Sequence, residues 1–277
     1  MRLIQLSDLH LTDAVDRLVN GFPVYDSFRQ IFHSALALRP DYILCTGDLS
    51  DDGTVGSYQI LEAILARTSI PVSILYGNHD RPLLNSRYQK FFLLGDWQVL
   101  CVDSVKPDSI WGEGKISESE LEWLREQLQN SDRSTIIALH HHPILLAGEL
   151  SWLNQIGLEN RVEFINLIQS FPQVRAVIFG HMHRAFAQEL CFTLNPCTSR
   201  RGEFLQYQPC RYSYKIHLWG APSTCYQVVT SAEKQHNSGQ GWAGFRVIDL
   251  LEYQRMSSFV VRLLDCPAMD VPPVVVH

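Results

Sequence analysis

Five short apolar runs, each followed at once by Asp, His or Asn residues, constrain the fold of this chain more than any other feature. The runs are rich in Ile, Val, Leu and Tyr, and they occupy residues 3–6, 42–45, 72–76, 135–139 and 174–179. Runs of this length and composition predict buried β-strands. Helical patterns lie between them, and this alternation predicts an α/β fold with largely parallel pairing in this part of the chain.

Four amphipathic patterns predict the helices. Their apolar positions are 28, 31, 32, 35 and 36 in the first, 58, 61 and 65 in the second, 121, 124 and 128 in the third, and 164, 167, 168 and 171 in the fourth. The first helix should stop before Pro40, which disfavours helical geometry at Arg39. Ser117 and Glu120 form a candidate capping box that predicts the start of the third helix.

Beyond Phe186 the pattern changes to short β-prone pieces separated by Pro, Gly, Ser and Asn. They occupy residues 203–207, 215–219, 226–229, 244–248 and 259–263. We expect them to form a second sheet packed against the first. The length and the 46% hydrophobic content suffice for one large core. We therefore expect one domain over residues 1–266, with an insertion at 191–215 and an extended tail at 267–277.

The segments that follow the five runs carry the chemistry. They read SDLH (7–10), TGDLS (46–50), GNHD (77–80), HHHP (140–143) and GHMH (180–183). Ligands of α/β sheets bind beyond the carboxyl ends of the strands, so the five segments should converge on one crevice. Asp8 with His10, and His181 with His183, are i, i+2 pairs, whose side chains would project to one side of an extended backbone roughly 7 Å apart.

The mixture of residue types in these segments indicates a metal site. A lone Asp-x-His or Gly-Asp is more often a turn or a helix cap than a ligand set. Here all five segments occur in order, each directly after a predicted strand, and this combination favours a ligand set over turns and caps. Imidazole, carboxylate and amide oxygen together suit Mn, Fe or Zn better than Ca or Mg.

These residues resemble the signature of the calcineurin-like metallophosphoesterase superfamily. The segments LHHHP (139–143) and APSTC (221–225), with Gly241 and Trp242, resemble its class III cyclic nucleotide phosphodiesterases, a branch that includes the bacterial cyclic AMP phosphodiesterases. The likeness covers most of residues 2–250 and departs at about 191–215, where this chain is longer. It implies a four-layer α/β/β/α sandwich of two packed mixed sheets flanked by helices, with a dinuclear metal site at the carboxyl ends of the strands.

The resemblance also implies roles for individual residues, in two ligand sets that share one member. One set is Asp8, His10 and His183, the other is Asn78, His141 and His181, and Asp48 bridges the two ions. His141 is assigned among three consecutive histidines because the family's ligand stands two residues before the proline. Asn78, His79 and His183 would contact the substrate.

The implied reaction is hydrolysis of a small phosphodiester by in-line attack of a hydroxide shared by two divalent or mixed-valence ions. His79 would donate the proton to the leaving group, since imidazole is the usual proton donor near neutral pH, and Asp80 would orient it. Asp80 could instead cap the turn after the GNH segment (77–79). The substrate that the resemblance implies is a 3′,5′-cyclic nucleotide such as cyclic AMP.

Several other residues have a structural interpretation that competes with a functional one. His140 and His142 flank a ligand in extended backbone and should point away from the metals. The aromatic residues Tyr207, Tyr212, Tyr214 and Trp219 are either core or a wall for base stacking, and core comes first. The cysteines at 191, 197 and 210 match no zinc knuckle, and the arginines at 200, 201 and 211 are expected to be solvated.

Composition excludes some functions and leaves others open. The formal charge of −6 gives no reason to expect stable binding of nucleic acid. No secretory leader or run of 18 apolar residues occurs, so we expect a cytoplasmic protein with no membrane span. Seven scattered cysteines fit free thiols in a reducing compartment, although one bridge stays possible. Oligomeric state and metal identity stay open.

The same ligand pattern also serves glycerophosphodiesterases, nucleotide pyrophosphohydrolases and phosphomonoesterases, so these remain alternative activities. A member of a different class, a metal-bound interaction scaffold without turnover, would keep the fold and the ions. The complete ligand set and the presence of His79 count against the scaffold.

Overall fold

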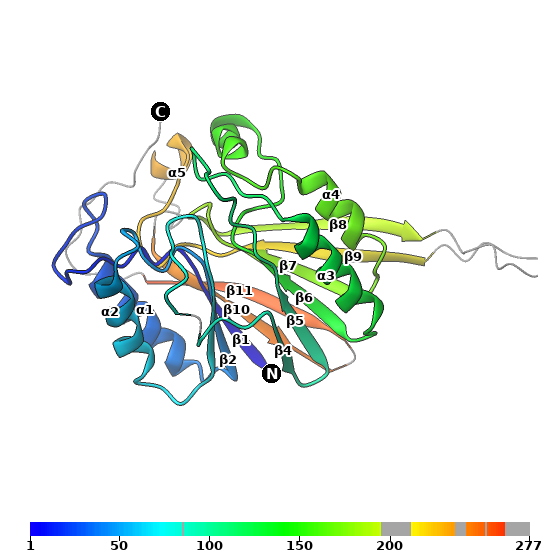
Figure 1. Cartoon of the computed structure of the whole chain (residues 1–277), viewed down its shortest axis with the longest axis horizontal. Coiled ribbons are helices and arrows are strands. Elements are labelled where there is room, and N and C mark those ends of the chain that lie inside the picture. Colours follow the sequence, from blue (N-terminus) through cyan, green and yellow to red (C-terminus); the bar gives the residue numbers. More distant parts are fainter. Residues whose placement is uncertain (85, 195–211, 236–241, 253, 264–277) are drawn as a thin grey trace, which may run out of the picture.

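In the computed structural model (Figure 1), two mixed β-sheets pack against each other and helices cover their outer faces. The structure describes residues 1–84, 86–194, 212–235, 242–252 and 254–263. This arrangement confirms the predicted four-layer sandwich. Most of the expected insertion at 191–215 and the tail at 267–277 lie outside the described residues.

The first sheet has the strand order β11-β10-β1-β2-β3. Its strands are β1 (Arg2–Leu6), β2 (Tyr42–Thr46), β3 (Val72–Leu75), β10 (Gly244–Leu250) and β11 (Met256–Arg262). β1, β2 and β3 run parallel, whereas β10 is antiparallel to β1 and β11 is antiparallel to β10. The carboxyl ends of β1, β2 and β3 therefore meet at one edge.

The second sheet has the order β4-β5-β6-β7-β9-β8. Its strands are β4 (Phe91–Leu94), β5 (Trp97–Cys101), β6 (Ser134–Ala138), β7 (Val174–Phe179), β8 (Phe186–Leu194) and β9 (Tyr212–Gly220). The four central strands are parallel, and β4 and β8 pair antiparallel at the two edges.

Two pairs of helices form the outer layers. Helices α1 (Val24–Ala37) and α2 (Val55–Leu65) pack on the first sheet, and α3 (Glu118–Gln129) and α4 (Arg161–Ile168) pack on the second. A 3-10 helix (Gly148–Gln155) and the short α5 (Ser231–Gln235) lie in connecting segments. Ser117 caps α3 as predicted, because its Oγ accepts from the Glu120 backbone N–H. The Glu120 carboxylate accepts from Asp103 N and Lys90 Nζ, and its bonds among the described residues do not include the Ser117 N–H that a capping box requires.

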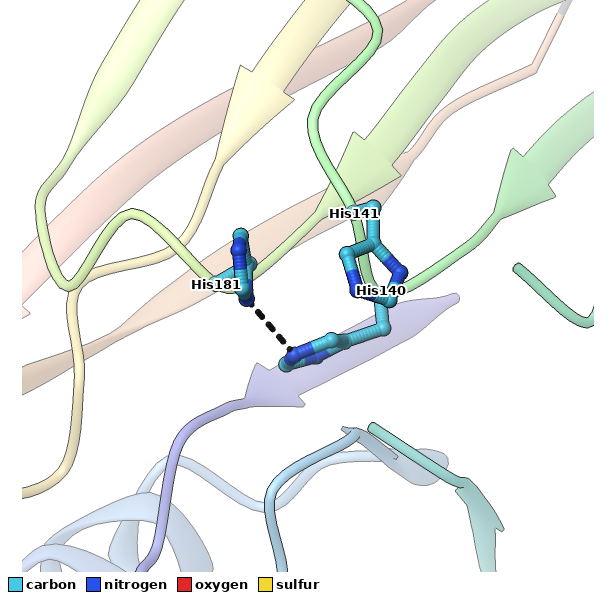
Figure 2. Close-up of side chains that lie close together, drawn as sticks. All are labelled: His140, His141 and His181. Atoms are coloured by element: carbon cyan, nitrogen blue, oxygen red, sulfur yellow. Dashed lines mark hydrogen bonds between the residues drawn. The ribbon is translucent and has the colours of Figure 1, made fainter. Parts of the chain in front are cut away.

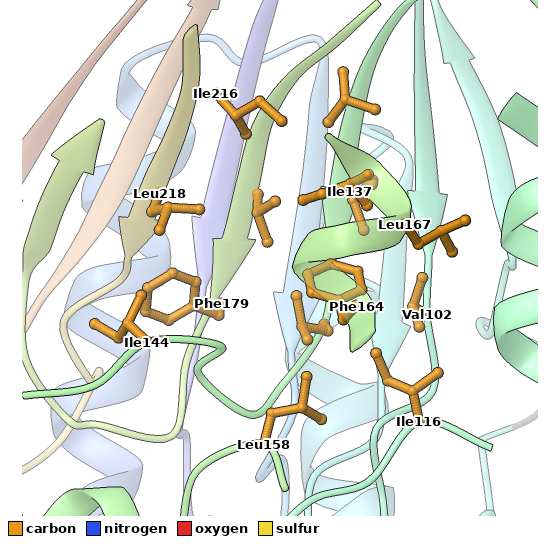
Figure 3. Packing of buried hydrophobic residues seen from close by; sticks show 14 of the residues in the cluster. Val102, Ile116, Ile137, Ile144, Leu158, Phe164, Leu167, Phe179, Ile216 and Leu218 are labelled. Atoms are coloured by element: carbon orange, nitrogen blue, oxygen red, sulfur yellow. The ribbon is translucent and has the colours of Figure 1, made fainter. Parts of the chain in front are cut away.

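Alternation along the strands sorts the apolar side chains into three layers. Leu3 and Leu44 point between the two sheets, whereas their neighbours Ile4 and Ile43 point towards α1 and α2. Figure 3 shows the third layer, in which Phe164 of α4 packs over the second sheet. Because the central strands are buried on both faces, their sequences read as continuous apolar runs.

The later strands differ from the prediction. They do not build a sheet of their own, because β10 and β11 extend the first sheet and β8 and β9 extend the second. Residues 226–229 form a loop rather than a strand, and the predicted strand at 203–207 lies outside the described residues. Strands β4, β5 and β8 were not predicted, and β4 alternates buried and exposed residues.

Among the described residues, Cys45, Cys101, Cys191 and Cys225 are free thiols, in line with the expectation for these four. Burial raises the pKa of the Cys45 thiol to about 12, so it is protonated and unreactive at neutral pH. No helix in the described part of the chain is long and apolar enough to span a bilayer.

Candidate metal centre

The carboxyl ends of β1, β2, β3, β6 and β7 bring the predicted residues to one place between the two sheets. Asp8 and His10 follow β1, Asp48 follows β2, Asn78 follows β3, and the histidines at 140–142 and at 181 and 183 follow β6 and β7. Asp8, His10, Asp48, His181 and His183 are buried, with exposed fractions of 7% or less. Their convergence is the arrangement that the sequence analysis predicts.

The backbone at these residues is not extended. Asp8, His10, Asp48, His181 and His183 all have φ between 46° and 67°, in the left-handed region. Non-glycine residues in this region are uncommon, at a cost of order 1–3 kcal/mol each, and they cluster at functional sites. The pairs Asp8 with His10 and His181 with His183 therefore converge, but not through the extended backbone that we expected. The turn after each strand, not the pleat, aims the side chains.

Glycines allow the turns to pack closely. A Cβ at Gly77 would lie 2.2 Å from Asp48 Oδ1, and a Cβ at Gly47 would lie 2.3 Å from His140 Nδ1. Gly47 also has a φ of 96°, which a side chain would strain, whereas Gly77 is required only for space. The two glycines thus let the loops after β2 and β3 press against the side chains of the centre.

The first cluster of candidate ligands contains Asp8, His10, Asp48 and His183, whose ligand atoms lie within 4.8 Å of one another. His10 Nδ1 donates to Asp51 Oδ1 at 2.9 Å, and His183 Nδ1 donates to the Tyr226 carbonyl at 3.0 Å. In each neutral ring the Nε2 atom then carries a lone pair. The two Nε2 atoms lie only 3.0 Å apart, so their lone pairs face each other without a hydrogen between them. A cation between the two rings would satisfy both, so these residues fit a metal ion.

The second cluster contains His140, His141 and His181. Figure 2 shows the His140 ring directed towards His181, with 3.1 Å between His140 Nε2 and His181 Nδ1. His140 Nε2 also lies 3.2 Å from Asn78 Oδ1. His140 Nδ1 donates to the Thr46 carbonyl, which fixes the ring with Nε2 facing the cluster. The expectation that His140 points away from the centre is therefore wrong.

His141 is placed differently. Its Nε2 donates to the Gly112 carbonyl at 3.0 Å, and its Nδ1 lies 2.9 Å from Ser104 Oγ. Burial, with the charge of His140 next, holds the pKa of His141 well below its usual range. Both ring nitrogens of His141 thus have protein partners. His142 is also buried, and its Nε2 would lie 2.7 Å from a Cβ at Gly157.

Asp48 lies between the two clusters. Its Oδ2 is 3.6 Å from His10 Nε2 and 3.4 Å from His140 Nε2, while its Oδ1 accepts from the His79 backbone N–H. Burial alone would raise the pKa of this carboxyl, but His140, His10 and His79 together outweigh burial and hold the pKa well below its usual range. For His140 burial would lower the pKa, but Asp48, with smaller effects of Asp8 and the Thr46 carbonyl, raises it to about 9.

His79 lies at the edge of the first cluster, with 40% of its side chain exposed. Its Nδ1 contacts the Asp51 carbonyl at 3.2 Å, and its ring meets that of His10 edge to face at 4.8 Å. An imidazole in this position can exchange a proton with a group bound at the cluster and with solvent.

Asp80 does not orient His79 through any hydrogen bond among the described residues. Its carboxylate accepts from the backbone N–H groups of Gly77, Leu49 and Ser50 and from the Tyr58 hydroxyl. Burial, with the charge of Asp48 next, raises the pKa of Asp80 to about 6. Asp80 joins the loops after β2 and β3, which agrees with the alternative interpretation as a cap of the turn.

Sequence reasoning missed the residues that hold the candidate ligands in place. Asp51 fixes His10 and lies beside His79, and its signal was its place directly after the TGDLS segment. The segment 221–225 supports Asp8, because Ser223 Oγ donates to the Asp8 carbonyl at 2.8 Å. The Tyr226 ring packs 4.5 Å from that of His183.

The remaining candidates take structural places or lie outside the description. Tyr214 and Trp219 are core residues with exposed fractions of 4% and 7%, as expected. The side chain of Tyr212 is outside the described part, and so are residues 197, 200, 201, 207, 210, 211 and 241.

Comparisons with known proteins agree with this site. The family described as calcineurin-like phosphoesterase matches residues 1–185. The chain is 31% identical to a 3′,5′-cyclic-nucleotide phosphodiesterase of Nostoc sp. over 90% of this chain and 87% of that protein. It is 32% identical to the 3′,5′-cyclic adenosine monophosphate phosphodiesterase CpdA of Escherichia coli over 66% of this chain and 70% of CpdA.

Among solved structures, a dimetal phosphatase from Danio rerio superposes with a TM-score of 0.64 at 17% identity, covering 95% of this chain and 98% of that one. This likeness supports the fold. The fold and the cluster of ligand-type side chains define a metal-dependent hydrolase of phosphoric esters. The chain belongs to the calcineurin-like phosphoesterase family.

Proposed function

We propose that this protein hydrolyses a 3′,5′-cyclic nucleotide such as cyclic AMP at a centre of two divalent metal ions. The observation that carries the proposal is the position of Asp48, whose carboxylate lies between the two clusters of candidate ligands. The names and the coverage of the Nostoc and Escherichia coli relatives support the choice of a cyclic nucleotide.

We assign the first ion to Asp8, His10 and His183, with Asp48 shared. For the second ion we replace His141 by His140, together with Asn78 and His181. The reason is the direction of the ring nitrogens, since His140 Nε2 faces Asp48, Asn78 and His181 whereas both nitrogens of His141 have protein partners.

The donor set favours Mn, Fe or Zn as the ions. The first cluster combines two imidazoles with two carboxylates, and the second consists of imidazoles. This mixture suits these metals better than Mg or Ca. When bound, such ions neutralise the charge of the phosphoryl oxygens and supply an activated water. The protein fixes the ligands beforehand through Asp51, Tyr226 and Thr46, which accept from the Nδ1 atoms of His10, His183 and His140.

In this proposal His79 donates the proton to the leaving oxygen. Its partly exposed ring lies beside the first cluster, its contact with the Asp51 carbonyl fixes Nδ1, and Nε2 would face the substrate. Asn78, His79 and His183 would contact the substrate. Asp80 would serve the site by holding the loops that carry Asp48 and Asn78.

A substrate panel under matched Mn²⁺ conditions tests the function. It should contain cyclic AMP, cyclic GMP, 2′,3′-cyclic nucleotides, glycerophosphodiesters, nucleotide pyrophosphates and phosphomonoesters. We expect the highest kcat/KM for a 3′,5′-cyclic nucleotide. A higher value for monoesters would contradict the phosphodiesterase assignment. Failure to release nitrophenol from bis(p-nitrophenyl) phosphate, with ions shown to be bound, would favour the non-catalytic scaffold.

A further inference from the structure

The loop that follows β5 carries two large apolar side chains in solvent. Ile110 is 80% exposed and Trp111 is 77% exposed, which are the highest values for large apolar residues in the described part of the chain. The two residues are consecutive in the sequence, and adjoining exposed apolar side chains, unlike scattered single ones, are a mark of interaction sites.

The loop is attached directly to the candidate metal centre. Gly112 follows Trp111, and its carbonyl accepts from His141 Nε2 at 3.0 Å. A Cβ at Gly112 would lie 3.0 Å from Asn78 Nδ2 and 3.8 Å from His181 Cε1. Trp111 is therefore adjacent in sequence to a residue that packs against two proposed ligands of the second ion.

A network around Glu113 fixes the tip. The Glu113 carboxylate accepts from Lys106 Nζ at 2.7 Å, from Ser109 Oγ at 2.8 Å and from the Trp111 backbone N–H at 3.0 Å. Ser109 Oγ in turn accepts from the Gly112 N–H. A loop with this many internal bonds presents its exposed side chains at little further entropic cost on binding.

We propose that Trp111, with Ile110 beside it, binds the base of the nucleotide and thereby selects nucleotides over other phosphoric esters. The inference rests on the proposed function. The Asp, His and Asn side chains of the centre would be occupied by the phosphate and its ions, so the base would need a surface next to them. The indole offers a large flat face of the kind on which bases stack, and stacking accepts different bases because each has a π-face.

Binding of two product-like ligands to the Mn²⁺-loaded full chain tests this role without turnover. The ligands are 5′-AMP and ribose 5-phosphate, which share the phosphate and the sugar and differ by the base. Calorimetry should show tighter binding of 5′-AMP to the wild-type protein. Trp111→Ala should weaken 5′-AMP about tenfold and leave ribose 5-phosphate within about twofold, and Trp111→Phe should retain most of the affinity.

Val162→Ala provides a matched control, because Val162 is 68% exposed on α4 and has no part in the loop. Val162→Ala should change neither the affinity for 5′-AMP nor that for ribose 5-phosphate. All variants should bind the same number of metal ions as the wild type. Equal wild-type affinity for the two ligands, no binding of 5′-AMP, or unchanged 5′-AMP binding in Trp111→Ala would overturn the proposal. The wild-type protein could fail to hydrolyse cyclic AMP while Trp111→Ala still loses the preference for 5′-AMP. That result would refute the proposed function and uphold base binding by Trp111.

Discussion

The two clusters of candidate ligands differ in charge. The first contains two carboxylates, Asp8 and Asp48, and two imidazoles, whereas the second contains imidazoles and the neutral amide of Asn78. The shared Asp48 reaches the second cluster through its Oδ2, which lies 3.4 Å from His140 Nε2. A cation in the first position would therefore be held mostly by its own carboxylates, and one in the second would depend on the shared residue.

This asymmetry shows how two sheets can build one site. The first sheet provides Asp8, His10, Asp48 and Asn78, and the second sheet provides His140, His181 and His183. His183 lies with residues of the first sheet and Asn78 with residues of the second, so each cluster takes ligands from both. This difference between the two clusters can be tested by mutations that should remove metal from one position more than from the other.

Replacement of Asp48 should have the largest effect. Asp48→Ala removes the carboxylate that lies between the clusters, so we expect loss of metal at both positions and a fall in kcat/KM of at least about 10³-fold. Asp8→Ala should remove only the first ion. Metal analysis after gel filtration measures both outcomes. If Asp48→Ala retained two ions, the bridging position would be wrong.

Replacement of His140 should empty the second position alone. We expect His140→Ala to bind about one ion fewer than the wild type and to lose about 10²-fold in kcat. His141→Ala is the matched control, since it should keep both ions while losing thermal stability, because Ser104 and the Gly112 carbonyl lose a buried partner. The reverse pattern, with metal lost only from His141→Ala, would restore His141 as the ligand.

His79 should matter for chemistry rather than for metal. We expect His79→Ala to keep both ions and to slow cyclic AMP hydrolysis about 10²-fold, because the alkoxide leaving group needs a proton. Nitrophenyl esters leave without that help and should slow much less. A comparison of kcat for the two substrates separates these effects. Equal slowing would argue against His79 as the proton donor.

Much of the fold and the convergence of the site could be predicted from sequence. The five runs are buried on both faces, so their apolar continuity was a strong signal, and each was followed by ligand-type residues. Strand β4 was missed because its alternating half-exposed sequence carries a weaker signal. The partition of β8 to β11 between two sheets depends on long-range pairing, which local patterns do not encode.

The details of the site needed coordinates. The direction of His140 follows from the Thr46 carbonyl, 94 residues away in sequence. The prediction that the i, i+2 pairs project to one side assumed an extended backbone, whereas Asp8 and His183 have left-handed backbone angles. Asp80 looked like a partner of His79 because the two are adjacent, yet its four donors belong to the loops after β2 and β3 and to Tyr58.

Competition between protons and metal at His140 should give the smallest and most specific effect. In the metal-free protein burial lowers the pKa of His140, but Asp48, Asp8 and the Thr46 carbonyl together outweigh burial and raise the pKa to about 9. Because the pKa is raised, the ring carries a proton below pH 9, and a metal ion must displace it. We expect the affinity for Mn²⁺ at the second position to rise about tenfold per pH unit from pH 7 to pH 9 and then level off.

Calorimetry in buffers with different ionisation enthalpies counts the released protons. His140→Gln is the control: we expect it to release about one proton fewer than the wild type, because glutamine has no proton to lose. The raised pKa of His10 adds release that is common to both proteins and cancels in the difference. Equal proton release from the two proteins would mean that no ion binds at His140 Nε2, and the two clusters would then differ in occupancy as well as in charge.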